Sequence, residues 1–282
     1  MLYILLAILS SVGVIHFLKL GALRNVPRFP LFAVNYAVAF LAGFVRIDAP
    51  TSLVGLPVGY WLLAGSVGVA FVIAFFALSR AVAEAGPSLA TTVSRLAIAI
   101  PVAISILLFG ETANPKQLMG ITLTLIILPL ASGQPPGSQR VSRGQGGRAF
   151  LWLLILFLLF GFNDVAFKVR EEFYTAVDER AFTTILFGTA LLLTSFLTLR
   201  RRLPLSRETV LLGLFLGTVN YFSAYWIIRA LQVLPAFRVY PVNSIGIIVV
   251  ATVSSIFLWR ERPQAHHYVF YVGALAAVYL LS

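Results

Sequence analysis

The sequence predicts an all-α membrane protein in which ten transmembrane helices form two inverted five-helix repeats. Three observations lead to this fold class. First, 60% of the 282 residues are hydrophobic and only 11% are charged, with a mean hydropathy of +0.94, whereas about a quarter of the residues in a soluble domain are charged. Second, the apolar residues gather into ten segments of about the length of a bilayer span. Third, residues of one half recur in the other half at a nearly constant offset.

The ten apolar segments follow one another with mostly short gaps, so neighbouring helices are expected to be antiparallel. A helix needs about 20 apolar residues to cross a bilayer. The predicted spans are residues 2–22, 29–46, 57–80, 88–109, 115–132, 149–169, 180–199, 208–229, 235–259 and 264–281. Strands do not suit these segments, because period-2 alternation is missing and lipid leaves no backbone group unpaired. The apolar start lacks a basic flank and a cleavage site, so we expect a retained span rather than a signal peptide.

One gap is long and polar, namely "GQPPGSQRVSRGQGGR" at residues 133–148. Its content of Gly, Pro, Ser and Arg predicts a flexible linker. The linker divides the chain into a first five-helix repeat at residues 1–132 and a second five-helix repeat at residues 149–282.

The two halves share residues at matching positions, which indicates a duplication. Pairs 149 positions apart, or 150 for the last, are Lys19 with Lys168, Gly68 with Gly217, Arg80 with Arg229, Ala81 with Ala230, and Glu111 with Glu261. Because five spans is an odd number, the second half must enter the membrane from the opposite side. This is the inverted-repeat architecture of many secondary transporters, in which a site lies near the midplane where the halves meet.

The basic residues predict an orientation. Twelve arginines lie in the gaps after the odd-numbered spans, whereas six lysines and arginines lie in the gaps after the even-numbered spans. The positive-inside rule then puts the odd gaps in the cytoplasm and both termini outside. We expect an integral protein of a bacterial inner (plasma) membrane, surrounded by membrane lipids.

Several function classes are disfavoured by composition and motifs. The chain has no cysteine, which excludes disulfides, thiolate nucleophiles and Cys-ligated metals. The net charge of +11 comes from residues in short gaps, without a basic tract interleaved with aromatics, so no nucleic-acid partner is expected. HExxH, GxSxG, Walker and GxGxxG motifs are absent in a suitable context, and the adjacent His266 and His267 point to different helix faces. The sequence therefore predicts no enzyme activity, no cofactor and no metal.

Two stretches carry a family resemblance, "ALSRAVAEAGPSLATTVSRLAIAIPVAISILLFGETANPKQLMG" and "IIRALQVLPAFRVYPVNSIGIIVVATVSSIFLWRERP". Each runs from an Ala-containing helix end through a Pro-bearing turn into a long helix closed by Gly-Glu or Arg-Glu. The chain resembles the drug/metabolite transporter superfamily, in its ten-helix EamA-type branch, and Lys19 and Lys168 at the ends of the first helices also fit. The resemblance implies a transporter fold over essentially the whole chain, but it specifies the substrate poorly. A monomer would suffice, since one chain holds both repeats.

One departure from the family bears on coupling. The resemblance to four-helix, proton-coupled relatives implies a membrane-embedded glutamate eight residues before the lysine, but Ser11 and Phe160 stand there. His16 and Asp164 are the nearest titratable substitutes and are our proton-coupling candidates. His16 could instead only hydrogen-bond to a neighbouring helix. Asp164 could instead form an internal ion pair with Lys168 one turn later.

Ionisable or polar groups in spans are costly and usually face a bundle interior or an aqueous cavity. The predicted substrate-binding residues are Lys19, Arg95, Lys168, Asn220, Tyr225, Arg238, Tyr240 and Asn243. For the basic residues the alternative is snorkelling to the membrane surface or a structural ion pair. For Tyr225 the alternative is an interfacial aromatic belt. Glu111 and Glu261 are expected to be structural, pairing with Lys116 or Arg262 across tight turns.

The predicted function is secondary transport, as export or exchange, of a small metabolite by alternating access at a central cavity between the inverted halves. Four basic residues, Lys19, Arg95, Lys168 and Arg238, against one buried acid predict a positive field, which favours an anionic or zwitterionic substrate. A proton is the expected coupling ion. The alternative is a membrane-embedded lipid-handling protein or enzyme without solute transport.

Overall fold

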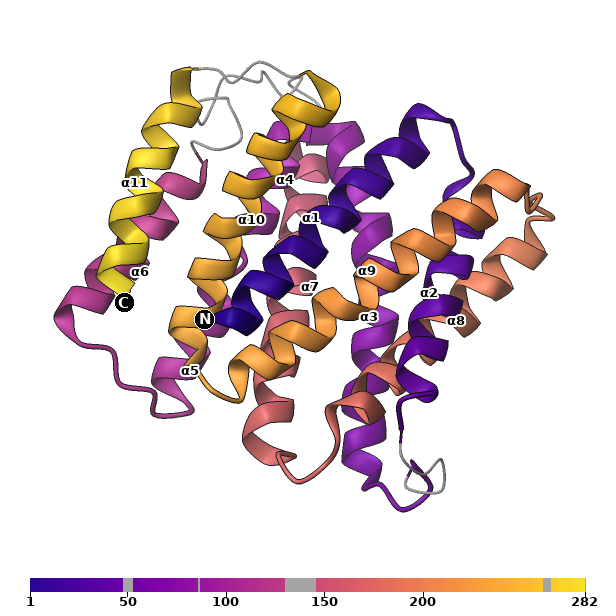
Figure 1. Cartoon of the computed structure of the whole chain (residues 1–282), viewed down its shortest axis with the longest axis horizontal. Coiled ribbons are helices and arrows are strands. Elements are labelled where there is room, and N and C mark those ends of the chain that lie inside the picture. Colours follow the sequence, from indigo (N-terminus) through magenta and orange to yellow (C-terminus); the bar gives the residue numbers. More distant parts are fainter. Residues whose placement is uncertain (48–52, 86, 130–145, 261–264, 282) are drawn as a thin grey trace. The chain divides into compact units, whose positions relative to one another are not determined.

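The structure is a computed structural model that describes residues 1–47, 53–85, 87–129, 146–260 and 265–281, and within these ranges every regular element is a helix (Figure 1). The helices in chain order are α1 (Leu2–Leu23), α2 (Arg28–Phe44), α3 (Val58–Ala85), α4 (Pro87–Leu96), α5 (Ala99–Leu107), α6 (Pro115–Ile127), α7 (Gly146–Phe173), α8 (Glu179–Arg200), α9 (Arg207–Leu231), α10 (Ala236–Trp259) and α11 (Ala265–Leu281). The predicted linker at 133–148 lies outside the described residues except for its last three, which begin α7.

Seven helices of the described chain are long and apolar enough to cross a membrane. They are Leu2–Leu23, Val58–Ala85, Leu89–Leu107, Gly147–Phe173, Glu179–Arg200, Arg207–Leu231 and Ala236–Leu258. Three shorter apolar helices, Arg28–Phe44, Pro115–Ile127 and Tyr268–Leu281, match the other predicted spans. The protein is therefore an integral membrane protein, and the count of ten spans stays a prediction.

The span predicted over residues 88–109 corresponds to the apolar segment Leu89–Leu107, but its helix is interrupted. The segment consists of α4 and α5, which are separated at Ala97 and Ile98. Pro101 has no backbone N–H to donate to the carbonyl of Ala97 and its ring disfavours the α-helical geometry four residues earlier. The N–H of Ile100 bonds to that carbonyl instead, at 3.0 Å. The break follows directly after Arg95, the charged residue of this span.

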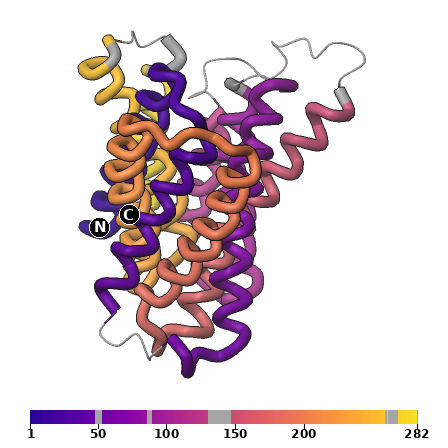
Figure 2. Tube along the Cα trace, turned by 90° about the vertical axis from the view of Figure 1, so that its right-hand side faces the viewer, coloured from indigo at the N-terminus to yellow at the C-terminus, as the bar shows by residue number. Residues whose placement is uncertain are grey.

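The helices group into two compact units with three boundaries between them, two of which fall inside α3 and α7 and the third between α9 and α10. Unit 1 comprises Met1–Val72 and Val169–Val233. Within it α2 packs along α8 and α9, and α1 runs beside α9, which Figure 1 and the side view of Figure 2 both show. An apolar cluster of Val26, Leu31, Leu212 and Leu216, with side chains of α1 against it, holds α1, α2 and α9 together.

Unit 2 comprises Ile73–Lys168 and Leu234–Ser282. Within it α6 packs on α11, and α5 packs on α10. Ala77, Ala81, Ala90 and Leu156 form the apolar cluster of this unit, and side chains of α7 complete it. Small alanine side chains on α3 and α4 allow α7 to approach closely, which is the usual means of helix association in lipid.

Unit 1 contains two close helix crossings at glycines that the predicted duplication relates to each other. A Cβ on Gly68 of α3 would lie 2.4 Å from the carbonyl oxygen of Leu186 in α8. A Cβ on Gly217 of α9, 149 positions later, would lie 2.5 Å from the carbonyl oxygen of Asn35 in α2. Both positions therefore require glycine for a close helix crossing. The inverted repeat itself stays a prediction.

Candidate functional site

The best-defined charged site of unit 2 joins Lys168 to Glu111. The ammonium of Lys168 lies 2.9 Å from Oε1 of Glu111, and the two side chains are only 9% and 11% exposed. The Glu111 carboxylate also accepts hydrogen bonds from the backbone N–H groups of Ala236, at 2.9 Å, and Phe237, at 3.3 Å. The expected pairing of Glu111 with Lys116 is wrong, and Glu261 and Arg262 lie outside the described residues; the ammonium of Lys116 stands over the ring of Tyr279 at 4.4 Å.

Local sequence explains why a carboxylate reaches this place. Gly110 adopts a φ of +68°, a left-handed conformation that glycine tolerates best, and turns the chain after α5. Asn114 then begins α6 with a capping box to Gln117. Glu111 lies between these two signals, outside the helices. The first N–H groups of α10 have no partner within their own helix, and the Glu111 carboxylate supplies it.

Proximity to Lys168 and to α10 also sets the ionisation of Glu111. Burial by itself would raise the pKa of this carboxyl group, but the hydrogen bond from Ala236, the ammonium of Lys168 and the hydrogen bond from Phe237 together lower the pKa below its ordinary value. Glu111 is therefore ionised at neutral pH. Glu111 thus neutralises the charge of Lys168, and the role of Lys168 in substrate binding stays a prediction.

A second charged pair in unit 2 consists of Arg95, near the end of α4, and Asp164 on α7. Their side-chain charges attract one another across the two helices. The hydroxyl of Tyr240, on α10, donates a hydrogen bond to the backbone carbonyl of Asp164. Thus α7 carries an acid and a base one turn apart, Asp164 and Lys168, and each has a partner of opposite charge on another segment.

The other predicted residues of unit 2 are Arg238 and Asn243, both on α10. Nε of Arg238 donates to the carbonyl oxygen of Leu281 at 2.6 Å, so this guanidinium caps the end of α11. Oδ1 of Asn243 is buried and has no hydrogen-bond partner among the described residues. Asn243 follows Tyr240 by three residues and so lies on the same side of α10. The structure thus brings Arg95, Asp164 and Tyr240 to one place, with Asn243 one turn further along.

The remaining predicted residues lie in unit 1. Asn220 of α9 donates to Oδ1 of Asn35 on α2 at 3.2 Å, and Asn35 is fully buried. The ring of Tyr225 packs at 4.8 Å from that of Trp226 and under the guanidinium of Arg46 at 5.0 Å. His16 and Lys19 are partly exposed residues of α1. Asn220 therefore links two helices, and Tyr225 belongs to an aromatic cluster beneath a cation.

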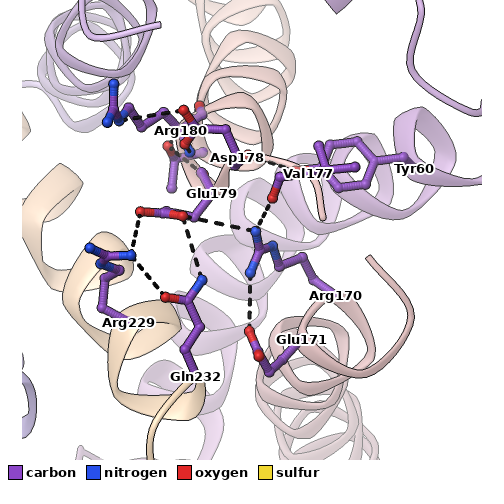
Figure 3. Close-up of polar contacts among 10 residues, drawn as sticks. Tyr60, Arg170, Glu171, Val177, Asp178, Glu179, Arg180, Arg229 and Gln232 are labelled. Atoms are coloured by element: carbon purple, nitrogen blue, oxygen red, sulfur yellow. Dashed lines mark hydrogen bonds and ion pairs between the residues drawn. The ribbon is translucent and has the colours of Figure 1, made fainter. Parts of the chain in front are cut away.

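An ionic cluster in unit 1 was missed by the sequence analysis (Figure 3). Arg170, with no exposed surface, donates to Glu171 at 3.1 Å and to the carbonyl of Val177, and lies 4.0 Å from the carboxylate of Glu179. Glu179 also pairs with Arg229 at 3.3 Å, and Gln232 bridges both. The cluster ties the ends of α7 and α9 to the start of α8. The available signal was a group of opposite charges around one short gap, "KVREEFYTAVDER".

No group of three or more His, Cys, Asp or Glu side chains that could hold a metal ion occurs in the part of the chain that the structure describes. What the site offers chemically is charge pairing: Arg95 and Asp164 oppose each other across two apolar helices, and Lys168 pairs with Glu111, which is anchored to a helix start. Ionisable residues in apolar spans generally mark substrate or ion pathways. The fold and these charges together define a polytopic helical membrane protein with opposite charges paired among its helices.

Comparison with known proteins bears on the second half of the chain. Residues 147–282 match the EamA-like transporter family. This match confirms the resemblance found in the sequence, which is to the drug/metabolite transporter superfamily.

Relatives of full length are also found. An uncharacterized protein of Haemophilus influenzae is 23% identical over 287 residues, a range that covers 99% of this chain and 96% of that protein. A crystal structure of another protein superposes with a TM-score of 0.80 at 17% identity, covering 100% of this chain and 95% of the other. At this identity the superposition shows a shared fold and carries no information on the substrate.

Proposed function

We propose that the protein is a secondary transporter that moves a small zwitterionic metabolite by alternating access. The observation that carries the proposal is the pair formed by Arg95 and Asp164 on two apolar helices of unit 2. Both residues are half-buried. Holding opposite charges in an apolar surrounding is expensive, and well-packed apolar side chains of similar volume are often as stable or more stable. The pair therefore adds little to the stability of the membrane helices. In a transport site, by contrast, the two charges can bind a charged substrate or ion.

The pairing of charges narrows the substrate class. The sequence left anionic and zwitterionic substrates open, because four basic residues appeared to face one acid. In unit 2, however, Glu111 neutralises Lys168, and Asp164 opposes Arg95. A simple anion that took Arg95 would leave the Asp164 carboxylate without its countercharge, which is costly in an apolar surrounding. A zwitterion offers a carboxylate to Arg95 and an ammonium to Asp164.

The proposed architecture is ten spans in two inverted repeats. The equivalent glycine contacts of Gly68 and Gly217 support it, as do apolar clusters in both units that join helices made equivalent by the repeat. Two contacts bear on the proposed orientation in the membrane. Arg24 pairs with Glu208, and the guanidinium of Arg201 stands over the ring of Phe29, so the basic gaps after α1 and α8 lie at one end of unit 1. This supports the proposal that these gaps are cytoplasmic and that both termini are outside.

We further propose that Asp164, rather than His16, exchanges the coupling proton. Asp164 faces an arginine that a substrate carboxylate could occupy, so binding at Arg95 and protonation at Asp164 would be linked. His16 is a partly exposed residue of α1 in unit 1.

The experiment is uptake into proteoliposomes with and without a pH gradient, using a panel of labelled zwitterions, organic acids and quaternary cations. We expect accumulation of a zwitterion, driven by the gradient. Asp164→Asn should lose gradient-driven accumulation and show weakened exchange, since it also removes the partner of the substrate ammonium, whereas His16→Gln should retain both exchange and accumulation. Glu208→Gln, which removes an exposed carboxylate, is the matched control. Transport of quaternary cations alone would overturn the substrate class, and gradient-driven accumulation by Asp164→Asn would overturn the coupling role.

The second candidate, a lipid-handling protein or enzyme without solute transport, has a different signature. Purified protein that converts a lipid in detergent, where no transmembrane gradient exists, would favour it over transport. The family match favours the transporter.

A further inference from the structure

Within unit 1, α2, α8 and the start of α3 enclose an apolar groove of about 380 Å³. Ile185 is buried at its base, while Trp61 and Leu192 on its rim are 42% and 73% exposed. Gly188 helps to keep the groove open, because a Cβ there would lie 3.1 Å from the ring of Phe40 on the opposite wall. By length and composition α3 and α8 can cross a membrane, and α2 is a shorter apolar helix. A groove between such helices that opens at the exposed Trp61 and Leu192 would be within reach of lipid.

The lining of the groove suits a hydrocarbon chain. Its two threonines use their hydroxyl groups internally: Thr184 donates to the carbonyl of Arg180 at 2.7 Å, and Thr189 donates to the carbonyl of Ile185 at 2.9 Å. The other lining residues are apolar. The groove extends along α8 from Thr184 to Leu192, about 12 Å at a rise of about 1.5 Å per residue. One leaflet of a bilayer has a hydrocarbon depth of about 15 Å, half of the roughly 30 Å core.

A cation lies at one end of the groove. Arg180 precedes Thr184 by one helical turn, and its side chain is 29% exposed. Its guanidinium donates to the carbonyl of Arg46 at the end of α2 and lies 3.5 Å from the carboxylate of Asp178. The guanidinium of Arg46 stands instead over the ring of Tyr225 on α9, at 5.0 Å. A phosphate at this end of the groove would compete with Asp178 for Arg180.

We propose that the groove is a lipid-binding site that takes an acyl chain of an anionic phospholipid, with the headgroup phosphate held by Arg180. The tail alone cannot select a lipid, since surrounding lipid tails are as apolar as the groove. The choice among lipids therefore rests on Arg180, and one such cation favours an anionic headgroup about fivefold.

Trp61 on the rim of the groove provides a local probe. The full-length protein with Trp152, Trp226 and Trp259 replaced by Phe keeps Trp61 as its only tryptophan and is reconstituted with mixtures of brominated and plain lipids. Bromine on an acyl chain quenches tryptophan fluorescence on contact. Brominated phosphatidylglycerol should quench Trp61 with an apparent affinity about fivefold or more above that of brominated phosphatidylcholine with the same chains. A protein that keeps only Trp152, on α7, is the reference for ordinary boundary lipid.

Substitutions separate the headgroup from the tail. Arg180→Gln should reduce the preference for phosphatidylglycerol about fivefold, Arg180→Lys should keep most of it, and Arg200→Gln, at the other end of α8, should leave it unchanged. Gly188→Leu fills the groove and should weaken quenching by both lipids. Equal quenching by the two lipids would overturn the proposal, as would a preference that survives Arg180→Gln. Quenching that instead disappears as the protein-to-lipid ratio rises would assign the groove to a second copy of the chain, which also overturns it.

Discussion

We expect Glu111→Gln to destabilise the protein far more than Glu208→Gln, although the two carboxylates lie at nearly the same distance from their cations. Glu111 is 2.9 Å from Lys168 and Glu208 is 2.8 Å from Arg24. Burial distinguishes the pairs: the side chains of the first are 9% and 11% exposed, and those of the second 59% and 42%. Removing one partner of a buried pair costs about 3–5 kcal/mol because a charge is left uncompensated. An exposed pair contributes about 0.2–1 kcal/mol.

The measurement is the melting temperature in one detergent, read from intrinsic fluorescence. For chains of 150–250 residues, 1 kcal/mol corresponds to about 2–4 °C, on a scale set by soluble proteins. Glu111→Gln should then lower the melting temperature by roughly 6–20 °C, and Glu208→Gln by no more than about 4 °C. The double variant Glu111→Gln with Lys168→Met should recover part of the loss, because it leaves no orphaned ammonium. Equal shifts for the two single variants, or strict additivity in the double variant, would refute the reasoning.

Acid should reproduce the effect in the unmodified protein. The folded-state pKa of Glu111 is lowered, chiefly because hydrogen bonds from α10 and the charge of Lys168 outweigh its burial. The stability that this group contributes is thus fully present above the ordinary carboxyl pKa of about 4.3 and is lost as the pH falls through the lower folded-state value. Comparing melting curves of the protein and of Glu111→Gln over that acid range isolates this contribution. Parallel pH profiles for the two proteins would contradict the assignment.

Three further predictions concern unit 1 and the start of α7. Gly217→Ala would place a Cβ 2.5 Å from a carbonyl oxygen of α2 and should cost about 1–3 kcal/mol; Gly147→Ala, where nothing lies within 4 Å, should cost nothing measurable in the same melting assay. Arg170→Met removes a guanidinium with no exposed surface that binds two segments, so a loss of about 3–5 kcal/mol is expected, and wild-type stability would disprove its bracing role. Ser11→Ala breaks the 2.7 Å hydrogen bond to Ser223 and should cost only about 0.6 kcal/mol; a change of several kcal/mol would mean that this contact does more than join α1 to α9.

Hydrophobicity was sufficient to predict the helices but not their grouping. Apolar length is a property of a local stretch of sequence, and every predicted span overlaps a helix of the described chain. The helix break after Arg95 could also have been predicted from the sequence, because Pro101 has no N–H to donate to the carbonyl four residues earlier. The division into units could not have been predicted, because two of its three boundaries fall inside α3 and α7, at positions where the sequence shows no break. Packing partners are decided by long-range shape, which hydropathy does not record.

The charged residues show the same limit. Sequence analysis selected Arg95, Asp164 and Lys168 because an ionisable side chain in an apolar run is conspicuous. Their partners could not be deduced, since Glu111 is 57 positions before Lys168 and 125 before Ala236. The local alternative, a turn closed by Lys116, looked adequate and was wrong. Asp164 and Lys168 also seemed suited to pair with each other on one helix face, but a partner from another segment stands opposite each of them.

The two charged pairs of α7 differ in how firmly they are held, and this difference assigns them different roles. Glu111 is fixed by an ammonium and by two N–H groups at the start of α10, so displacing it would expose a helix end as well as a charge. Asp164 is held at its backbone carbonyl by Tyr240, which leaves the carboxylate itself to face Arg95. A substrate can therefore replace a partner in the second pair at much lower cost than in the first. It follows that Lys168→Met should impair folding while sparing substrate choice, whereas Arg95→Lys should leave the melting temperature nearly unchanged and alter which substrates are transported.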